Sequence, residues 1–281
     1  MTTMNKKIVF FFCDNFKVEM YSYFSSMISV VLLGAGNVAT HLFKAFNNAE
    51  NIVINQWYNR SLSTISSYKN KVEIIDDLSL LKDADIYIIA VSDDAIAGLS
   101  EQLPFKNRLV AHTSGSVGVY DINKKQKRGV FYPLQTFSKD AEMDFANVPI
   151  CIETIDKKDY HTLKELAVSI GSPTKKVNSD QRRVLHLAAV FVNNFTNQLY
   201  RVGHEITESE GAEFDLLKPL IFETAKKIQE LSPYMAQTGP AKRHDKKTIK
   251  KQLKQLENKH HKDIYELLTN SIQHTHGRKK L

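Results

Sequence analysis

Apolar and polar positions follow two different patterns along this chain. Up to about residue 177, short apolar runs rich in β-branched residues alternate with stretches whose apolar residues recur at helical spacing. From residue 178 onward, long helical patterns replace them. Strands that alternate with helices predict a mostly parallel sheet, and the helical remainder predicts a second domain. Strands are predicted at 28–33, 52–58, 72–75, 84–91, 109–111, 129–132 and 149–153.

The turn after the first predicted strand has the spacing GxGxxA. Gly34 permits a tight turn, Gly36 lets the backbone approach a pyrophosphate, and Ala39 keeps the following helix close to the sheet. Free N–H groups at the start of that helix favour an anion. A plain turn without a ligand is the alternative. The predicted diphosphate site consists of Gly34, Ala35, Gly36, Asn37, Val38 and Ala39.

The residues that follow the second predicted strand favour NADP over NAD. Asn59, Arg60 and Ser61 stand about twenty residues past the glycines, where NAD-binding proteins usually place an acidic residue on the ribose. No acid is present there, and the planar guanidinium of Arg60 matches phosphate oxygens. We therefore predict NADP as the cofactor, with Arg60 at the 2′-phosphate and Asn59 and Ser61 as further cofactor-binding residues; an ordinary surface arginine is the alternative.

Two further strands end in polar residues. Val91, Ser92 and Asp93 are expected to border the cofactor, because ligands bind at the carboxyl ends of the strands in a doubly wound sheet. A helix cap without ligand contact is the alternative for Asp93 or Asp94. His112 and Ser114 follow the next strand and suit a substrate's oxygen atoms.

The first helix of the second domain, predicted at 179–206, is apolar nearly all round, which predicts that it is buried. His186, Asn193 and Asn197 stand out on it, since at 3.6 residues per turn they fall within about 40° of one another. Their partners are either a substrate and the nicotinamide or neighbouring backbone carbonyls. Further helices are predicted at 214–231 and along an apolar stripe at 249–268, with 274–281 disordered.

These patterns predict an α/β chain with a doubly wound, mostly parallel Rossmann sheet at 27–177, followed by an all-α substrate and dimerisation domain at 178–281 with a basic tail. Residues 1–26 do not fit this layout. The apolar run at 8–13 is either an edge strand or the product of an upstream start codon, with Met20 or Met27 as the biological start. We assign the extension no function.

Composition narrows the classes of partner. The net charge of +7 is concentrated at 241–281, where twelve Lys and Arg face four Asp and Glu. We interpret this as the solvent face of a terminal helix rather than a nucleic-acid surface, because Tyr265 is its only aromatic residue. Cys13 and Cys151 fit neither a disulfide framework nor a metal spacing, and no apolar window is long enough to span a membrane. We expect a cytoplasmic protein without a metal.

The combined motifs resemble a known family. They are GAGNVA at Gly34, NRS at Asn59, AVSDDAI at Ala90, HTSG at His112, YPLQTFS at Tyr132, LHLAAVFVNNFTN at Leu185 and TGPAKRHD at Thr238. This series resembles a group of bacterial Rossmann-like proteins with a C-terminal domain of unknown function, usually described as NADP oxidoreductases. The layout is similar to that of pyrroline-5-carboxylate reductases, deazaflavin-dependent NADP reductases and β-hydroxyacid dehydrogenases.

The resemblance implies an N-terminal NADP domain, a helical C-terminal domain that often builds a dimer, and an active site in the cleft between them. β-Hydroxyacid dehydrogenases carry a Lys four residues before an Asn on the corresponding helix, but Ala189 and Val190 occupy those positions here. His186 is the nearest replacement. The family commonly has His before the Pro-Leu-Gln stretch, where this chain has Tyr132.

The first hypothesis is therefore an NADPH-dependent reductase that moves a hydride to a carbonyl or imine carbon of a small molecule. His186 is the candidate proton donor, because the unperturbed pKa of histidine lies near neutrality. Asn193, His112 and Ser114 are candidates for orienting the substrate. The alternative is a non-catalytic NADPH-binding sensor or assembly protein that acts through its helical C-terminal domain.

Overall fold

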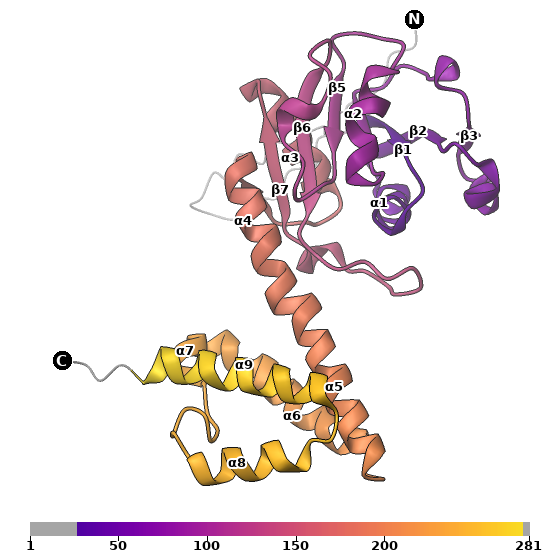
Figure 1. The fold of residues 1–281 in the computed structure, drawn as a ribbon. Helices are drawn as coiled ribbons and strands as arrows, with labels where there is room; N and C mark the ends of the chain where they lie inside the picture. Colours follow the sequence, from indigo (N-terminus) through magenta and orange to yellow (C-terminus); the bar gives the residue numbers. More distant parts are fainter. Residues whose placement is uncertain (1–26, 278–281) are drawn as a thin grey trace, which may run out of the picture. The chain divides into compact units, whose positions relative to one another are not determined.

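The computed structural model describes residues 27–277 (Figure 1). The extension at 1–26, including the apolar run at 8–13, and the last four residues lie outside the described part. Contacts between residues divide the chain into two compact units, one ending at His186 and one starting at Leu187. Each unit is described by itself below.

The first unit is built on one eight-stranded sheet in the order β3-β2-β1-β4-β5-β6-β7-β8. Neighbouring strands are parallel except for β6 and β7, which are antiparallel. The predicted fold class, a doubly wound and mostly parallel sheet followed by helices, is confirmed. The strands are β1 (Ile28–Leu33), β2 (Ile52–Tyr58), β3 (Glu73–Ile75), β4 (Ile86–Ile89), β5 (Leu109–His112), β6 (Lys127–Pro133), β7 (Ile150–Thr154) and β8 (Thr174–Lys176).

Helices cover both faces of this sheet (Figure 1). Helices α1 (Asn37–Asn48) and α3 (Lys157–Ser169) share one apolar core with Val30 and Leu32 of β1. Helix α2 (Asp93–Glu101) contributes to a second core with Val31 and Leu33. Alternate residues of β1 are therefore buried on opposite faces, which explains why the strand is apolar at nearly every position.

Trp57 ties the end of β2 to the glycine turn. Its ring is fully buried and stacks on Phe43 of α1 at a centroid distance of 4.5 Å. The indole N–H donates a hydrogen bond of 2.6 Å to the carbonyl oxygen of Gly34. Because a buried indole N–H needs an acceptor, this contact fixes the turn against the second strand.

The helical part of the chain departs from the predicted pattern in three places. The helix predicted at 179–206 is not uniform. A π-helical stretch, Val190–Phe195, separates α4 (Ser179–Ala189) from α5 (Thr196–Ser209). The apolar stripe at 249–268, predicted as one helix, is divided between two helices, α8 (Lys246–Gln255) and α9 (Lys259–His276). The remaining helices are α6 (Lys218–Glu230) and α7 (Pro233–Ala236).

The other two corrections have local causes. The side chain of Asn258 accepts hydrogen bonds from the backbone N–H groups of His260 and His261, so a new helix starts there and splits the stripe. Helix α9 then extends through His276, so the prediction of disorder from residue 274 was wrong for His274–His276. The capping residue Asn258 and the helical spacing after it are both local features of the sequence.

The prediction that the long helix is buried was also wrong for the single chain. Val192 is 73% exposed, and Phe191 and Val184 are more than half exposed. Within its described residues the second unit buries only Val202, Ala241 and His261. An apolar helix surface indicates that other residues pack against it. The sequence does not show whether those residues belong to the same chain or to another one. No helix among residues 27–277 has the length and apolar character to cross a membrane.

Candidate functional site

The glycine turn between β1 and α1 requires glycine at its first position. Gly34 has a φ of +112°, and a Cβ atom there would lie 2.3 Å from the carbonyl oxygen of Ala90, which follows β4. Its N–H donates to the carbonyl of Tyr58 at 2.9 Å. The turn therefore passes between the ends of β2 and β4, the two strands that flank β1, in a conformation and a space that only glycine fits.

The start of α1 fits a diphosphate. Gly36 is the N-cap residue, no side chain caps the helix, and its first turn contains no acidic residue. A Cβ atom on Gly36 would meet no atom within 4 Å, so the backbone there faces open space. Helix geometry leaves the first N–H groups without intrahelical partners, and the helix dipole favours an anion beside them. Ala35 and Val38 are half-buried, and Ala39 is fully buried under the turn.

A loop that sequence reasoning left without a role supports this turn. The side-chain amide of Asn37 donates to the carbonyl of Phe137 at 2.8 Å, and Nε2 of the buried His41 lies 2.8 Å from the carbonyl of Ser138. The rings of His41 and Phe137 are also in contact. The segment after β6 is therefore fastened to α1 beside the diphosphate position.

The residues after β2 form an exposed polar turn. The amide of Asn59 donates to the carbonyl of Ser61 at 2.9 Å, which orders the turn around Arg60. Arg60 is exposed, and within residues 27–277 it has no ion-pair partner. The hydroxyl of Ser61 lies 2.8 Å from that of Ser63, a residue that sequence reasoning missed. An exposed guanidinium beside two hydroxyls suits a phosphate group.

Neither aspartate after β4 caps α2. Ser92 is the N-cap residue and makes no side-chain cap, while Asp93 and Asp94 lie in the first helical turn. Acidic residues there are stabilised by the helix dipole. The Asp93 carboxylate accepts a hydrogen bond from the Ser116 hydroxyl, which joins the first turn of α2 to the loop after β5, and Val91 is half-buried.

His112 organises the loop after β5. Its ring is fully buried, and Nδ1 accepts a hydrogen bond of 3.1 Å from the Ser114 N–H. Nε2 therefore carries the proton and donates to the carbonyl of Gly118 at 3.3 Å. Burial, with a smaller contribution from the charge of Arg182, lowers the pKa of His112 to about 4. A neutral ring with both nitrogens bonded to backbone holds a loop and cannot also exchange protons with a substrate.

Ser114 has a similar local task. Its hydroxyl oxygen accepts hydrogen bonds of 3.1 Å from the N–H groups of Ser116 and Val117, and the residue is buried. The loop therefore wraps around this oxygen. Of the two polar residues predicted to orient a substrate here, both are engaged with the backbone of their own loop.

His186 lies at the carboxyl edge of the sheet, against this loop and the end of β6. Its Nδ1 is 3.1 Å from the hydroxyl oxygen of Tyr132, and the two rings meet edge to face. A Cβ atom on Gly115 would lie 2.6 Å from Nδ1, so glycine at that position gives the histidine room. Burial raises the pKa of Tyr132 to about 12, which keeps its phenol protonated. His186 itself remains exposed.

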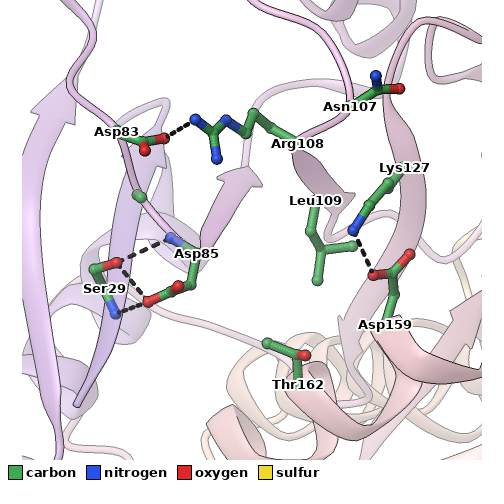
Figure 2. Close-up of a pocket in the computed structure, with 10 residues that line it drawn as sticks. Ser29, Asp83, Asp85, Asn107, Arg108, Leu109, Lys127, Asp159 and Thr162 are labelled. Atoms are coloured by element: carbon green, nitrogen blue, oxygen red, sulfur yellow. Dashed lines mark hydrogen bonds and ion pairs between the residues drawn. The ribbon is translucent and has the colours of Figure 1, made fainter. Parts of the chain in front are cut away.

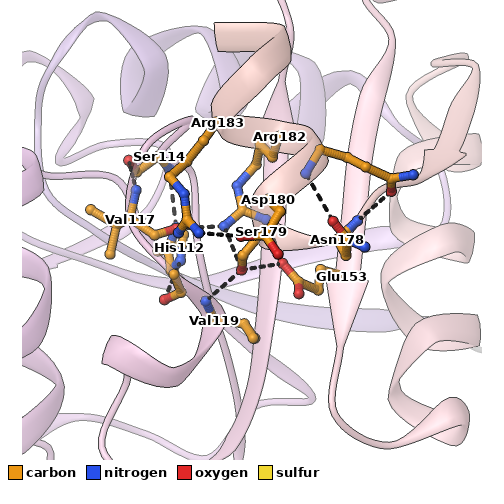
Figure 3. A network of polar contacts seen from close by, with 12 residues as sticks. His112, Ser114, Val117, Val119, Glu153, Asn178, Ser179, Asp180, Arg182 and Arg183 are labelled. Carbon is orange, nitrogen blue, oxygen red and sulfur yellow. Dashed lines mark hydrogen bonds and ion pairs between the residues drawn. The ribbon is translucent and has the colours of Figure 1, made fainter. Parts of the chain in front are cut away.

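A buried arginine that sequence reasoning missed holds the first turn of α4 (Figure 3). Arg182 is completely buried, and its guanidinium forms an ion pair of 2.5 Å with Glu153 of β7. The same group donates to the carbonyl of Val117 and to the hydroxyl of Ser179. Ser179 in turn donates to Glu153 at 2.7 Å and accepts from the Val119 N–H. Only its place one turn before His186 hinted at this role.

The predicted polar stripe is not maintained along the helix. It assumed 3.6 residues per turn, but the stretch that contains Asn193 is π-helical, and i→i+5 bonding places more residues in each turn. Asn193 and Asn197 are exposed and belong to the second unit, whereas His186 belongs to the first. The first unit thus brings together the glycine turn, the Arg60 turn, Asp93, the His112 loop and His186.

A polar pocket of about 330 Å³ lies at the opposite, amino edge of the sheet (Figure 2). Its charged groups have partners within the protein, since Arg108 pairs with Asp83 at 2.8 Å and Lys127 with Asp159 at 3.6 Å. The fifth charged group, Asp85, accepts hydrogen bonds from the N–H and the hydroxyl of Ser29 at 2.8 and 2.6 Å, so each charged group of the pocket has a polar partner within the protein. Across the described residues, no group of His, Cys, Asp and Glu side chains could hold a metal ion.

The fold and the site define a dinucleotide-binding protein of the Rossmann class with a helical C-terminal part. Two family profiles match the chain: "NADP oxidoreductase coenzyme F420-dependent" at residues 29–114 and "Domain of unknown function (DUF2520)" at residues 148–272. No curated protein matches.

Solved structures place the chain more closely. A Bacteroides fragilis protein, provisionally described as an NADP oxidoreductase, shares 37% identity over 90% of this chain and 99% of its own, with a TM-score of 0.79. The chain belongs to this NADP oxidoreductase family, as predicted, and NADP is the cofactor of the family. Two further structures share the fold. They are 1-pyrroline-5-carboxylate reductase from Streptococcus pyogenes (10% identity, 89% and 99% coverage, TM-score 0.60) and an imine reductase from Pseudomonas sp. (16%, 89% and 94%, 0.65).

The depressed pKa of His112 predicts an acid-sensitive contribution to stability. Between pH 6.5 and about 4 the unfolded chain binds a proton at His112 that the folded protein does not, so stability falls as the pH falls through this window. The slope from this residue reaches about 1.4 kcal/mol per pH unit. Urea unfolding at several pH values should show a shallower slope for His112→Asn than for the wild type. The exposed His161→Asn is the control, and equal slopes in all three proteins would contradict the assignment.

Proposed function

We propose that this protein is an NADPH-dependent reductase that transfers a hydride between the nicotinamide and a carbonyl or imine carbon of a small molecule. The observation that carries the proposal is the placement of His186. It lies at the same edge of the sheet as the glycine turn and is held by Tyr132. NADPH supplies the hydride when bound, so the protein must bind it, orient the acceptor and supply a proton.

The residues present fit these tasks. The N–H groups at the start of α1 bind the diphosphate, and Arg60 with Ser61 and Ser63 binds the 2′-phosphate. Tyr132 remains protonated and donates its hydroxyl hydrogen to Nδ1 of His186. As negative charge develops on the oxygen or nitrogen of the acceptor, Nε2–H of His186 gives its proton to that atom while Nδ1 takes the hydroxyl proton of Tyr132, and the phenolate regains a proton from water.

The similar folds of the pyrroline-5-carboxylate reductase and the imine reductase make cyclic imines the first substrates to test, with aldehydes and ketones beside them. Ala189 and Val190 stand where β-hydroxyacid dehydrogenases carry a lysine. Because that lysine is missing, a non-catalytic sensor that binds NADPH without turnover is the second candidate function. We also propose a cytoplasmic location, which the buried free thiol of Cys151 suits.

We further propose that the protein is a homodimer through its C-terminal helices. Apolar side chains on the second unit are widely exposed, including Phe191, Val192, Leu220 and Phe222, while few of its residues are buried. A helical unit with so little core of its own needs a cover. We propose a second copy of the chain as the partner, because a twofold interface pairs the same surface on both copies. Such an interface would bury the exposed apolar side chains of both helical units.

Arg60 should determine the choice between the two nicotinamide cofactors. Titration followed by nicotinamide fluorescence should show tighter binding of NADPH than of NADH. Arg60→Ala should weaken NADPH binding by roughly tenfold or more, since it removes charge-assisted hydrogen bonds, and should leave NADH binding unchanged. Lys69→Ala, an exposed cation on the same segment, should leave both unchanged. Equal affinities for NADPH in wild type and Arg60→Ala would refute this role.

His186 should determine turnover rather than cofactor binding. With a cyclic imine or carbonyl that supports NADPH oxidation, His186→Ala should lower kcat by about 10² to 10⁴ and leave the affinity for NADPH unchanged. His161→Ala should behave as the wild type. Unchanged turnover in His186→Ala would remove His186 from the reaction, and NADPH binding without turnover on any substrate would favour the sensor.

The apolar helices should hold the dimer. Light scattering on the full chain should give twice the chain mass of 32.1 kDa, and the double change Phe191→Glu with Val192→Glu should give the mass of one chain. Leu80→Glu, an exposed apolar residue of the first unit, should leave the mass unchanged. A wild type that remains a monomer at all concentrations would disprove the proposal.

A further inference from the structure

The first turn of α4 is joined to the sheet by groups that the proposed reaction does not use. Arg182 contacts three parts of the first unit: Glu153 on β7, Val117 in the loop after β5, and Ser179 on its own helix (Figure 3). These contacts hold α4 to the loop that His112 and Ser114 shape. These contacts fix α4 one turn before His186, the residue to which we assign proton donation.

Spacing connects this cluster to His186. Arg182 follows Ser179 by three residues and precedes His186 by four, so the three side chains lie on one face of the α-helix. That face is the one turned to the sheet, because Ser179 and Arg182 bond to Glu153 and His186 bonds to Tyr132. A rotation of α4 that released Arg182 would therefore also move His186 away from Tyr132.

Stability alone does not explain a buried arginine here. Taking both charges out of water is costly, and an apolar pair of similar size is often as stable as a buried ion pair. Moreover, Nε of Arg182 is buried without a hydrogen-bond partner among the described residues, which adds to the cost. What the guanidinium provides and an apolar side chain cannot is a fixed orientation between three backbone segments.

The hydrogen bond from Tyr132 requires one particular orientation of the His186 ring, with Nδ1 toward the phenol. Within the described residues the Tyr132 hydroxyl has no other hydrogen-bond partner, and Tyr132 is buried. Its hydrogen is therefore used only if Nδ1 of His186 accepts it, which leaves the proton of a neutral ring on Nε2. Gly115 allows this approach because no side chain occupies the space beside Nδ1.

We propose that Arg182 is a positioning residue that holds the first turn of α4 so that Nδ1 of His186 accepts the Tyr132 hydroxyl and Nε2–H faces the substrate. The inference rests on the role given to His186 in the proposed function. It is tested on the geometry itself, so its outcome does not depend on whether a substrate is found.

The test measures the proximity of the two rings by nuclear Overhauser effects in the full chain, deuterated except at histidine and tyrosine. The variants are Arg182→Met and the double change Arg182→Met with Glu153→Gln. The second avoids leaving a buried carboxylate unpaired if the first does not fold. Arg183→Met is the matched control, since Arg183 is the next residue, is exposed and, among residues 27–277, has Asp180 as its only ion-pair partner. His186→Gln assigns the cross-peaks.

The wild type and Arg183→Met should show cross-peaks between the rings of Tyr132 and His186, and the Arg182 variants should weaken them at least fivefold. Two other ring pairs serve as references in the same spectra. The neighbouring residues Tyr160 and His161, at 6.2 Å like the 6.1 Å of the tested pair, calibrate the cross-peak intensity, and Tyr234 with His276 at 4.5 Å reports the fold of the second unit. Both control pairs should keep their cross-peaks.

Full-strength cross-peaks between Tyr132 and His186 in a folded Arg182 variant would overturn the proposal. So would their absence in the wild type. If the cross-peaks behave as expected but no carbonyl or imine is ever reduced, the proposed reaction fails while the positioning role of Arg182 stands. If turnover depends on His186 but the Arg182 variants keep the ring contact, the positioning role fails alone.

Discussion

The close approach of Gly34 to the backbone of Ala90 is the constraint on which the first unit depends. It forces the chain to turn within the space between two strand ends, and so fixes where α1 begins. Trp57 and Tyr58 then fasten the turn to β2, and the loop after β6 fastens α1 from the other side. The start of α1, the exposed Arg60 turn and the His112 loop thereby share one edge of the sheet, as a dinucleotide requires.

Much of the first unit could be predicted, because its signals are local. Short β-branched runs, the glycine spacing and the missing acid before Arg60 each occupy a few neighbouring residues. Arg182 could not be predicted, since its partners Glu153 and Val117 lie 29 and 65 residues away and only the folded sheet brings them together. The π-helical stretch was missed because apolar residues on every side leave no stripe whose phase could reveal it. His112 looked available for chemistry because burial and backbone partners do not show in a sequence.

The family profiles and the contacts divide the chain at different places, and the Arg182 cluster lies in the difference. The C-terminal profile begins at residue 148 and so includes β7, α3 and β8, whereas the contacts keep everything up to His186 with the sheet. Glu153, Ser179 and Arg182 all lie inside that profile, and Val117 lies outside both. The polar cluster thus joins the part of the chain matched by the C-terminal profile to the loop after β5, within one folded unit.

The reversal of direction at β7 has a consequence for helix polarity. Because β7 runs against β6 and β8 runs parallel to β7, the chain leaves the sheet away from its carboxyl edge, and α4 then returns toward that edge. Helices α1 and α2 start at the edge and present backbone N–H groups there, with the positive end of their dipoles. Helix α4 arrives in the opposite sense and offers no such groups, so whatever it contributes must come from side chains. The change of strand direction at β7 therefore gives the two kinds of helix different roles. Helices α1 and α2 offer backbone N–H groups to the anionic cofactor, and α4 offers the imidazole of His186 to the reacting atom.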